Sequence, residues 1–273
     1  MKLMYITNSP QIAEIALTAG VDILFIDMEY MGKDIRQGGM DTVKNHHTID
    51  DVKAIRKVMD SHSGKSELLV RVNPIHEDSD NEITAAIENG ADIVMLPMWK
   101  TVDEVRDFIQ FVNKRAKACL LLETKEAAEI IDDVLELDGI DFVYIGLNDL
   151  HLSYNMKFIF QPLTEGIIDS LAEKINCKNI DFGFGGIAKL HQGAVPAEKV
   201  LGEHIRLGSK MVILGRSFCK PDDPRPLDEL KNEFISGVAE LRSEENKLKT
   251  VSASYLAENR SDIQNIVGKM IKG

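Results

Sequence analysis

The chain has 273 residues, of which 44% are hydrophobic and 28% charged, with a formal net charge of −12. This length is close to the ~250 residues of one (β/α)₈ barrel, so we predict a single domain over residues 1–273. The acidic charge argues against nucleic acid or an anionic membrane surface as a partner, and no apolar run of about 18 residues predicts a membrane span. Three widely spaced cysteines, Cys119, Cys177 and Cys219, indicate a reducing compartment, so we expect a soluble, cytoplasmic protein.

Five stretches of the chain repeat one design, in which a helix stop and a polar residue precede a mostly apolar run and a turn residue. They are residues 20–27, 90–97, 139–146, 179–185 and 208–215. Continuous apolar runs, unlike alternating ones, are typical of parallel strands that are buried on both faces. Amphipathic segments separate the runs. The sequence therefore predicts an α/β protein with the fold of a (β/α)₈ TIM barrel, whose chemistry lies at the carboxyl ends of its strands.

The predicted strands and helices alternate along the chain. Strands are expected at residues 3–7, 23–27, 67–73, 90–97, 118–123, 141–145, 180–184 and 210–214. Helices are expected from the cap Ser9 to Gly20, from the cap Thr48 to Met59, from the capping box at Thr101, and at residues 79–89, 125–137, 163–175, 197–207 and 227–247.

A further helix is expected at residues 254–272, beyond what closing the barrel requires. It either packs on its own barrel or forms an arm that packs on another subunit. The region 225–273 would in the second case join the subunits of a homo-oligomer.

Polar side chains gather at the predicted carboxyl ends of the strands. They are Asp27, Glu29, Arg71, Asn73, Glu123, Asn148 and Asp149. Adjacent strands are ~4.8 Å apart, so Glu123 and Asp149 can meet at one small ion. Two carboxylates that leave room for water and substrate oxygens suit Mg²⁺ or Mn²⁺. The alternative is that each acid begins a helix, where a negative charge is favoured.

Arg71 and the histidines have two possible roles each. A buried arginine needs an anionic partner, so we expect Arg71 to form a salt bridge with Asp27 or Glu29, to contact a substrate carboxylate or enolate, or to do both. His46 and His47 end the long polar loop from Glu29 and are either catalytic or ordinary loop residues. His204 is expected at the surface.

Several motifs together resemble the HpcH/HpaI aldolase and citrate lyase β-subunit family. They are Phe25-Ile-Asp-Met-Glu29, Val70-Arg-Val-Asn73, Gly90-Ala-Asp-Ile-Val-Met-Leu-Pro-Met98, Leu122-Glu-Thr-Lys-Glu-Ala127 and Ile145-Gly-Leu-Asn-Asp-Leu150. The resemblance runs in order from about residue 4 to residue 218.

The resemblance implies a metal-dependent lyase or aldolase that acts on a pyruvate- or oxaloacetate-type 2-keto acid and an aldehyde through a metal-stabilised enolate. By this likeness Glu123 and Asp149 bind Mg²⁺ or Mn²⁺, and Arg71 stabilises the enolate oxygen. Backbone N–H groups around Asn148 and Asp149 bind the substrate carboxylate. We assign Asp27 and His47, with Arg71, to catalysis, and Glu29 to substrate binding.

The chain departs from the aldolase pattern at three places, which keeps other functions open. Tyr30 stands where those aldolases carry a catalytic histidine, Leu121 stands for a glutamine, and the loop 31–45 is longer, so His47 is our candidate for the missing base. The alternatives are a CoA-thioester lyase of the citrate lyase β type and a non-catalytic barrel that binds keto acids. A Schiff-base mechanism is disfavoured because Lys100, Lys125 and Lys189 lie past strand ends.

Overall fold

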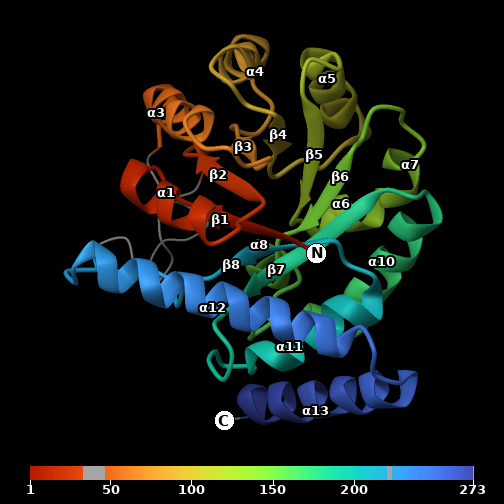
Figure 1. The fold of residues 1–273 in the computed structure, drawn as a ribbon. Helices are drawn as coiled ribbons and strands as arrows, with labels where there is room; N and C mark the ends of the chain where they lie inside the picture. The colour runs from red at the N-terminus through yellow and green to blue at the C-terminus, as the bar shows by residue number, and fades with distance from the viewer. Residues whose placement is uncertain (33–46, 220–222, 273) are drawn as a thin grey trace.

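The structure, a computed structural model, describes residues 1–32, 47–219 and 223–272 and has the predicted barrel architecture (Figure 1). Strands β1 to β8 are parallel and follow one another around a closed barrel in sequence order. Pairing of β1 with β8, with Lys2 opposite Met211, closes the circle. The prediction of a (β/α)₈ barrel is confirmed.

The eight strands are β1 (Lys2–Ile6), β2 (Ile23–Asp27), β3 (Glu67–Arg71), β4 (Ile93–Leu96), β5 (Lys117–Leu122), β6 (Phe142–Ile145), β7 (Asp181–Ile187) and β8 (Met211–Leu214). The helices before β6 are α1 (Pro10–Thr18), α3 (Ile49–Asp60), α4 (Ser79–Glu88), α5 (Val102–Val112), α6 (Lys125–Glu129) and α7 (Ile131–Val134). Those after it are α8 (Leu147–Ser153), α9 (Gln161–Thr164), α10 (Ile167–Cys177), α11 (Ala197–Leu207), α12 (Leu227–Leu248) and α13 (Ala253–Lys272).

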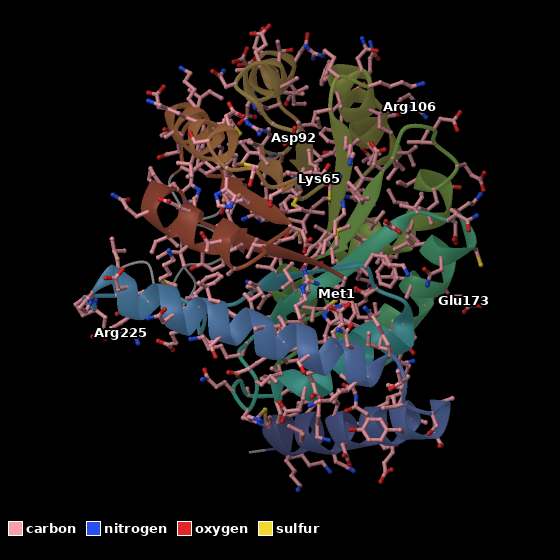
Figure 2. All side chains as sticks on the ribbon, in the orientation of Figure 1. Met1, Lys65, Asp92, Arg106, Glu173 and Arg225 are labelled. Atoms are coloured by element: carbon pink, nitrogen blue, oxygen red, sulfur yellow. The ribbon has the colours of Figure 1, made fainter. Side chains whose placement is uncertain are left out.

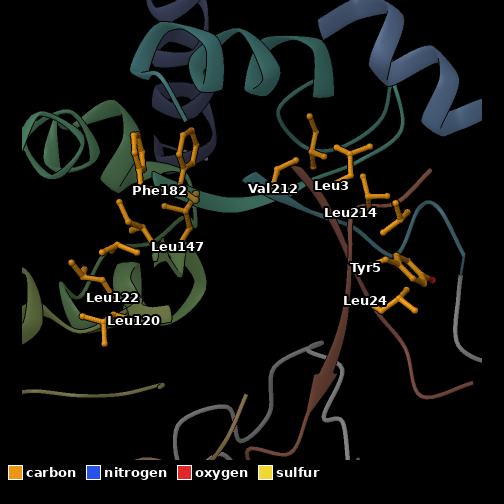
Figure 3. Packing of buried hydrophobic residues seen from close by; sticks show 14 of the residues in the cluster. Leu3, Tyr5, Leu24, Leu120, Leu122, Leu147, Phe182, Val212 and Leu214 are labelled. Atoms are coloured by element: carbon orange, nitrogen blue, oxygen red, sulfur yellow. The ribbon is translucent and has the colours of Figure 1, made fainter. Parts of the chain in front are cut away.

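Two hydrophobic clusters explain why the strand sequences are apolar throughout. One face of the strands contributes Phe25, Met95 and Tyr144 to a cluster inside the barrel. The other face packs against the surrounding helices, as Leu120, Phe182 and Val212 do in Figure 3. Because both faces are buried, neither can carry the polar residues that an alternating strand would show.

Most helix starts follow the predicted caps, but several boundaries differ. The capping boxes at Thr48 and Thr101 are both formed. The segment 125–137, predicted as one helix, forms α6 and α7 with a break at Ile130. Gly166 adopts φ +82° and delays the next long helix, α10, to Ile167. Strand β3 ends at Arg71, before the predicted Asn73.

The surplus C-terminal helix α13 packs on α11 of its own chain (Figure 1). Asn259 of α13 donates from Nδ2 to the carbonyl oxygen of Lys199 at 3.0 Å, and Lys199 Nζ lies 2.6 Å from Asp262. Residues 225–272 therefore pack on the barrel to which they belong, and the packing of the region 225–273 on a second subunit stays a prediction. In the described part of the chain, none of the helices combines the length and apolar character needed to cross a membrane.

Candidate active site at the carboxyl end of the barrel

Arg71 lies at the centre of a charged cluster at the carboxyl ends of β2 and β3. It is paired in register with Asp27, the last residue of β2. Its Nε donates to Asp27 Oδ1 at 2.8 Å and its Nη2 to Oδ2 at 2.9 Å, while Nη1 lies 3.3 Å from Glu29 Oε2. The predicted salt bridge is thus formed with both acids.

These charges are buried, which makes their pairing obligatory. Asp27 and Glu29 are almost completely shielded, and the Arg71 side chain is 14% exposed. Burial alone would lower the pKa of Arg71, but the charges of Asp27, Glu29 and Glu123 outweigh it and raise the pKa well above the usual value. Arg71 therefore stays charged and feels Glu123 as well as its two direct partners.

Asn73, which the sequence placed among the polar strand-end residues, holds the chain that follows β2. Its Oδ1 accepts hydrogen bonds from the backbone N–H groups of Tyr30 and Met31, both at 3.0 Å. Its Nδ2 donates to Glu82 of α4 at 2.7 Å. Asn73 thus positions the segment that carries Glu29. Tyr30, which by the resemblance stands where the aldolases carry a histidine, is 62% exposed.

Glu123 directly follows β5 and is buried. Its Oε1 accepts a hydrogen bond from the backbone N–H of Met98 at 3.2 Å, and Met98 has a positive φ of 55°. A Cβ at Gly146 would lie 3.0 Å from Glu123 Oε2, so Gly146 lets the next strand end approach this carboxylate. The sequence did not predict the contacts of Glu123 with Met98 and Gly146. Gly146 belongs to the motif 145–150, but its role as a close neighbour of Glu123 was not recognised. A contact through a backbone N–H leaves no signal in the sequence.

Asp149 lies in the first turn of α8, which a single residue, Gly146, separates from β6. Strands β5 and β6 are adjacent, and the N–H of Gly146 donates to the carbonyl of Leu122 at 2.9 Å, so the two acids come from neighbouring strand ends. Asp149 is buried and Asn148 is half-buried. Asp149 also begins a helix, as the alternative interpretation expected.

Glu123 and Asp149 supply oxygen donors, the ligands that Mg²⁺ and Mn²⁺ prefer. Within residues 1–32, 47–219 and 223–272, no three side chains of His, Cys, Asp or Glu are grouped as metal ligands. This donor set fits a cation that keeps water and substrate oxygens around it, and it does not fit a structural zinc ion with four protein ligands.

His47 is brought beside Asp27, whereas His46 lies outside the described residues. The backbone N–H of Asp27 donates to His47 Nδ1 at 3.0 Å. Nδ1 therefore carries the lone pair, and the neutral ring holds its proton on Nε2. In this tautomer Nε2 of His47 is a donor and cannot act as a base.

Three other residues that the sequence pointed to, Leu121, His151 and Lys189, are all buried. Leu121 is buried inside the barrel. His151 is buried in α8, where its Nδ1 lies 3.1 Å from the carbonyl oxygen of Leu147. Lys189 is buried and forms an ion pair with Glu233 of α12, outside the barrel, which agrees with the rejection of a Schiff-base lysine.

Comparison with known proteins decides the family. The model of the family described as HpcH/HpaI aldolase/citrate lyase matches residues 2–159, more than half of the chain. The chain belongs to this family. Over 155 residues it is 25% identical to a protein named hydroxypyruvate/pyruvate aldolase from Roseovarius nubinhibens, which covers 52% of this chain and 59% of the relative. The chain thus spans less than two thirds of that relative.

Two further matches concern the sequence and the fold. A 2-keto-3-deoxy-L-rhamnonate aldolase from Escherichia coli is 25% identical over 199 residues, covering 67% of this chain and 73% of the relative. Among solved structures, an HpcH/HpaI aldolase from Desulfitobacterium hafniense has a TM-score of 0.59 at 15% identity, covering 92% of this chain and 94% of that one. At that identity the structural match shows the fold alone.

Proposed function

We propose that this HpcH/HpaI family member is a divalent-metal-dependent carbon–carbon lyase or aldolase that acts on a pyruvate- or oxaloacetate-type 2-keto acid. The observation that carries the proposal is a charged arginine at the barrel mouth, fixed by Asp27 and Glu29 and within the electrostatic reach of Glu123. The aldolase names of the relatives support it.

Glu123 and Asp149 are the proposed ligands of the metal. Mg²⁺ is commonly bound through one or two carboxylates and keeps several water molecules, which agrees with two acids from adjacent strand ends. When bound, Mg²⁺ or Mn²⁺ would supply Lewis acidity that polarises the keto group. Asn148 and the backbone around Asp149 are proposed to contact the substrate carboxylate.

Arg71 is proposed to stabilise the oxygen on which negative charge develops when the carbon–carbon bond breaks. Its guanidinium has five N–H donors in one plane, and contacts with Asp27 and Glu29 fix that plane. A donor that is already oriented costs no reorganisation during the reaction. Glu29 and Asp27 thus act first through Arg71, by keeping it charged and in place.

His47 is proposed to act as a neutral hydrogen-bond donor, a change from the base that the sequence suggested. A base needs a lone pair directed at the substrate, but Nδ1 of His47 accepts from the N–H of Asp27. The proton on Nε2 can instead stabilise a second oxygen, for example that of the aldehyde. Neutral histidines serve as such electrophiles elsewhere.

The decisive experiment compares Glu123→Gln and Asp149→Asn with the wild type. We expect Mn²⁺ affinity, measured by calorimetry, to fall by about tenfold or more, because even outer-shell changes cost that much. Release of pyruvate or oxaloacetate from a panel of hydroxy-keto acids should be lost in parallel. Glu126→Gln, an exposed acid on α6, is the matched control.

Full activity of either variant, or of the wild type in EDTA, would contradict the proposal. Binding of pyruvate by the wild type without turnover of any substrate in the panel would instead favour the non-catalytic barrel, which Tyr30 and Leu121 originally suggested. The metal-binding measurement separates these outcomes because it does not depend on activity.

A further inference from the structure

A cavity of about 330 Å³ lies beside the carboxyl ends of β7 and β8. Its walls come from these strand ends, from the start of α8, from the segment between α8 and α9, and from the loop that leads into α11. The lining includes Leu147, Phe160, Gly186, Val195, Arg216 and Ser217. A cavity of this volume is in the range of small-molecule sites.

Leu147 lines this cavity and is the residue next to Gly146 in the chain. It follows Gly146, whose backbone lies against the Glu123 carboxylate. On its other side, Leu147 Cδ1 would be 2.8 Å from a Cβ at Gly185 of β7. The cavity therefore lies at the ends of β7 and β8, which follow β6 and its Asp149 around the barrel.

Gly186 shows how the cavity is kept open. Although it belongs to a strand of the closed barrel, it is exposed, and it lines the cavity. A Cβ at Gly186 would meet only the carbonyl oxygen of Ile213 at 3.6 Å, an ordinary contact. A larger side chain there would consequently enter the cavity rather than disturb the strand.

The lining combines apolar side chains with a few polar ones. Ile159, Phe160 and Ile187 are apolar, while Arg216 is the charged side chain among the described lining residues. Ser217 is held in place, because its Oγ accepts a hydrogen bond from the N–H of Lys189 at 2.9 Å and its own hydroxyl proton can still be donated. Lys189 is in turn tied to Glu233.

We propose that this cavity receives the far end of the acceptor substrate and that this end is anionic, a phosphate or a carboxylate bound by Arg216 and Ser217. Arginine matches the geometry of both groups, and the loops after strands 7 and 8 of (β/α)₈ barrels often bind phosphate. The inference rests on the proposed aldolase function, since it names the acceptor of that reaction.

The first test measures binding without turnover. Glycerol 3-phosphate and succinate serve as unreactive phosphate and carboxylate probes, and glycerol as the neutral control, in calorimetry with the wild type, Arg216→Gln and Arg106→Gln. Arg106 projects from α5 at the outer edge of the molecule (Figure 2). We expect one anionic probe to bind the wild type and Arg106→Gln equally, and Arg216→Gln about tenfold more weakly.

The binding test overturns the proposal if neither anion binds, or if Arg216→Gln binds as tightly as the wild type. The result does not depend on catalysis, so it stands even if no aldolase activity is found. Which of the two probes binds more tightly identifies phosphate or carboxylate as the natural group.

The second test measures acceptor preference with pyruvate and Mn²⁺. Glyceraldehyde 3-phosphate is compared with glyceraldehyde, and succinic semialdehyde with butanal. We expect kcat/KM to favour the anionic member of one pair by about tenfold, with this ratio lost in Arg216→Gln. Gly186→Val should reduce the rate with the preferred acceptor, and Gly268→Val on α13, where a Cβ meets nothing, is its control.

Equal kcat/KM values for the anionic and the neutral aldehyde in both pairs would overturn the proposal that the cavity binds an anionic acceptor. Exchange of pyruvate methyl protons in D₂O by the wild type, measured without acceptor, keeps the two proposals distinct. Exchange without any acceptor preference contradicts the cavity role alone, whereas absence of both exchange and aldol product contradicts the proposed function.

Discussion

The guanidinium of Arg71 is held on two sides, by Asp27 through Nε and Nη2 and by Glu29 through Nη1. A buried charge whose partner is removed typically costs 3–5 kcal/mol, so the three residues form one unit. A lysine could satisfy Asp27 or Glu29 as a point charge, but it could not bridge both in one plane. This rigidity is what suits Arg71 to a developing charge.

Arg71→Lys is expected to lower kcat for cleavage of the keto acid by roughly 10²–10³-fold, the usual effect of losing a preorganised donor. KM should change less, because the proposed interaction forms mainly in the transition state. Steady-state kinetics with the same substrate panel measures both constants. Arg106→Lys, in an exposed ion pair, should leave them unchanged. A kcat of Arg71→Lys equal to that of the wild type would remove Arg71 from its proposed role.

The pairing of Arg71 with its acids could be predicted because the barrel topology forces it. Residues at the carboxyl ends of neighbouring parallel strands meet whatever the details of packing, and β2 and β3 are consecutive. The contact of His47 Nδ1 with the N–H of Asp27 could not be predicted in this way. It depends on the path of a loop, and loop geometry leaves no periodic signal in the sequence.

At the scale of elements, the contact of α13 with α11 depends on a glycine. A Cβ at Gly202 of α11 would lie 2.6 Å from Asn259 Nδ2, so only glycine lets α13 approach. Asn259 is buried there and its Nδ2 donates to the carbonyl oxygen of Lys199. The two residues therefore form a fitted pair that fixes where the surplus helix packs.

A double-mutant cycle tests this pair. Gly202→Ala should lower the free energy of unfolding by about 1–3 kcal/mol through overpacking, and Asn259→Ala by about 1–3 kcal/mol through the lost hydrogen bond. The double variant should be no less stable than Asn259→Ala alone, since the clash disappears with the amide. Chemical denaturation measures all three. If the two substitutions changed the free energy of unfolding additively, the side chains at positions 202 and 259 would not interact.

The strands and most helix starts were predictable because each depends on local sequence. Apolar runs define β2, β5 and β6, and the capping boxes at Thr48 and Thr101 define two helix starts. The prediction that His204 lies at the surface was wrong, because His204 is buried. Its place on α11 is covered because Phe184 of β7 stacks on its ring at 3.9 Å, a long-range contact that the helix sequence does not reveal.

For the molecule as a whole, two buried groups on the outer layer predict sensitivity to acid. Glu245 of α12 lies beside the Met1 ammonium, near the centre of Figure 2. Burial alone would raise the pKa of Glu245, but Lys249, the Met1 ammonium and Arg242 outweigh it and lower the pKa to about 2. Its stabilisation is complete above its usual pKa of 4.5 and is lost as the pH falls through about 2.

His204 makes the stability of the protein depend on pH in a higher pH range than Glu245 does. Burial lowers the pKa of His204 from 6.5 to about 3, with a smaller opposing effect of Glu245. Its Nε2 has no hydrogen-bond partner among the described residues, and its Nδ1 lies 2.8 Å from Ser209 Oγ. Between these pKa values the unfolded chain binds a proton that the folded protein does not, so acidification favours unfolding.

We therefore expect the free energy of unfolding to fall by about 1.4 kcal/mol per pH unit through His204 alone as the pH drops from about 6.5 toward 3. Urea denaturation at a series of pH values measures this slope. His204→Gln and His204→Phe should both flatten it, whatever their stability at pH 7, because neither side chain can accept the proton. His62→Gln, a loop histidine, should keep the slope of the wild type. An unchanged slope in both His204 variants would place the acid-sensitive groups elsewhere in the barrel.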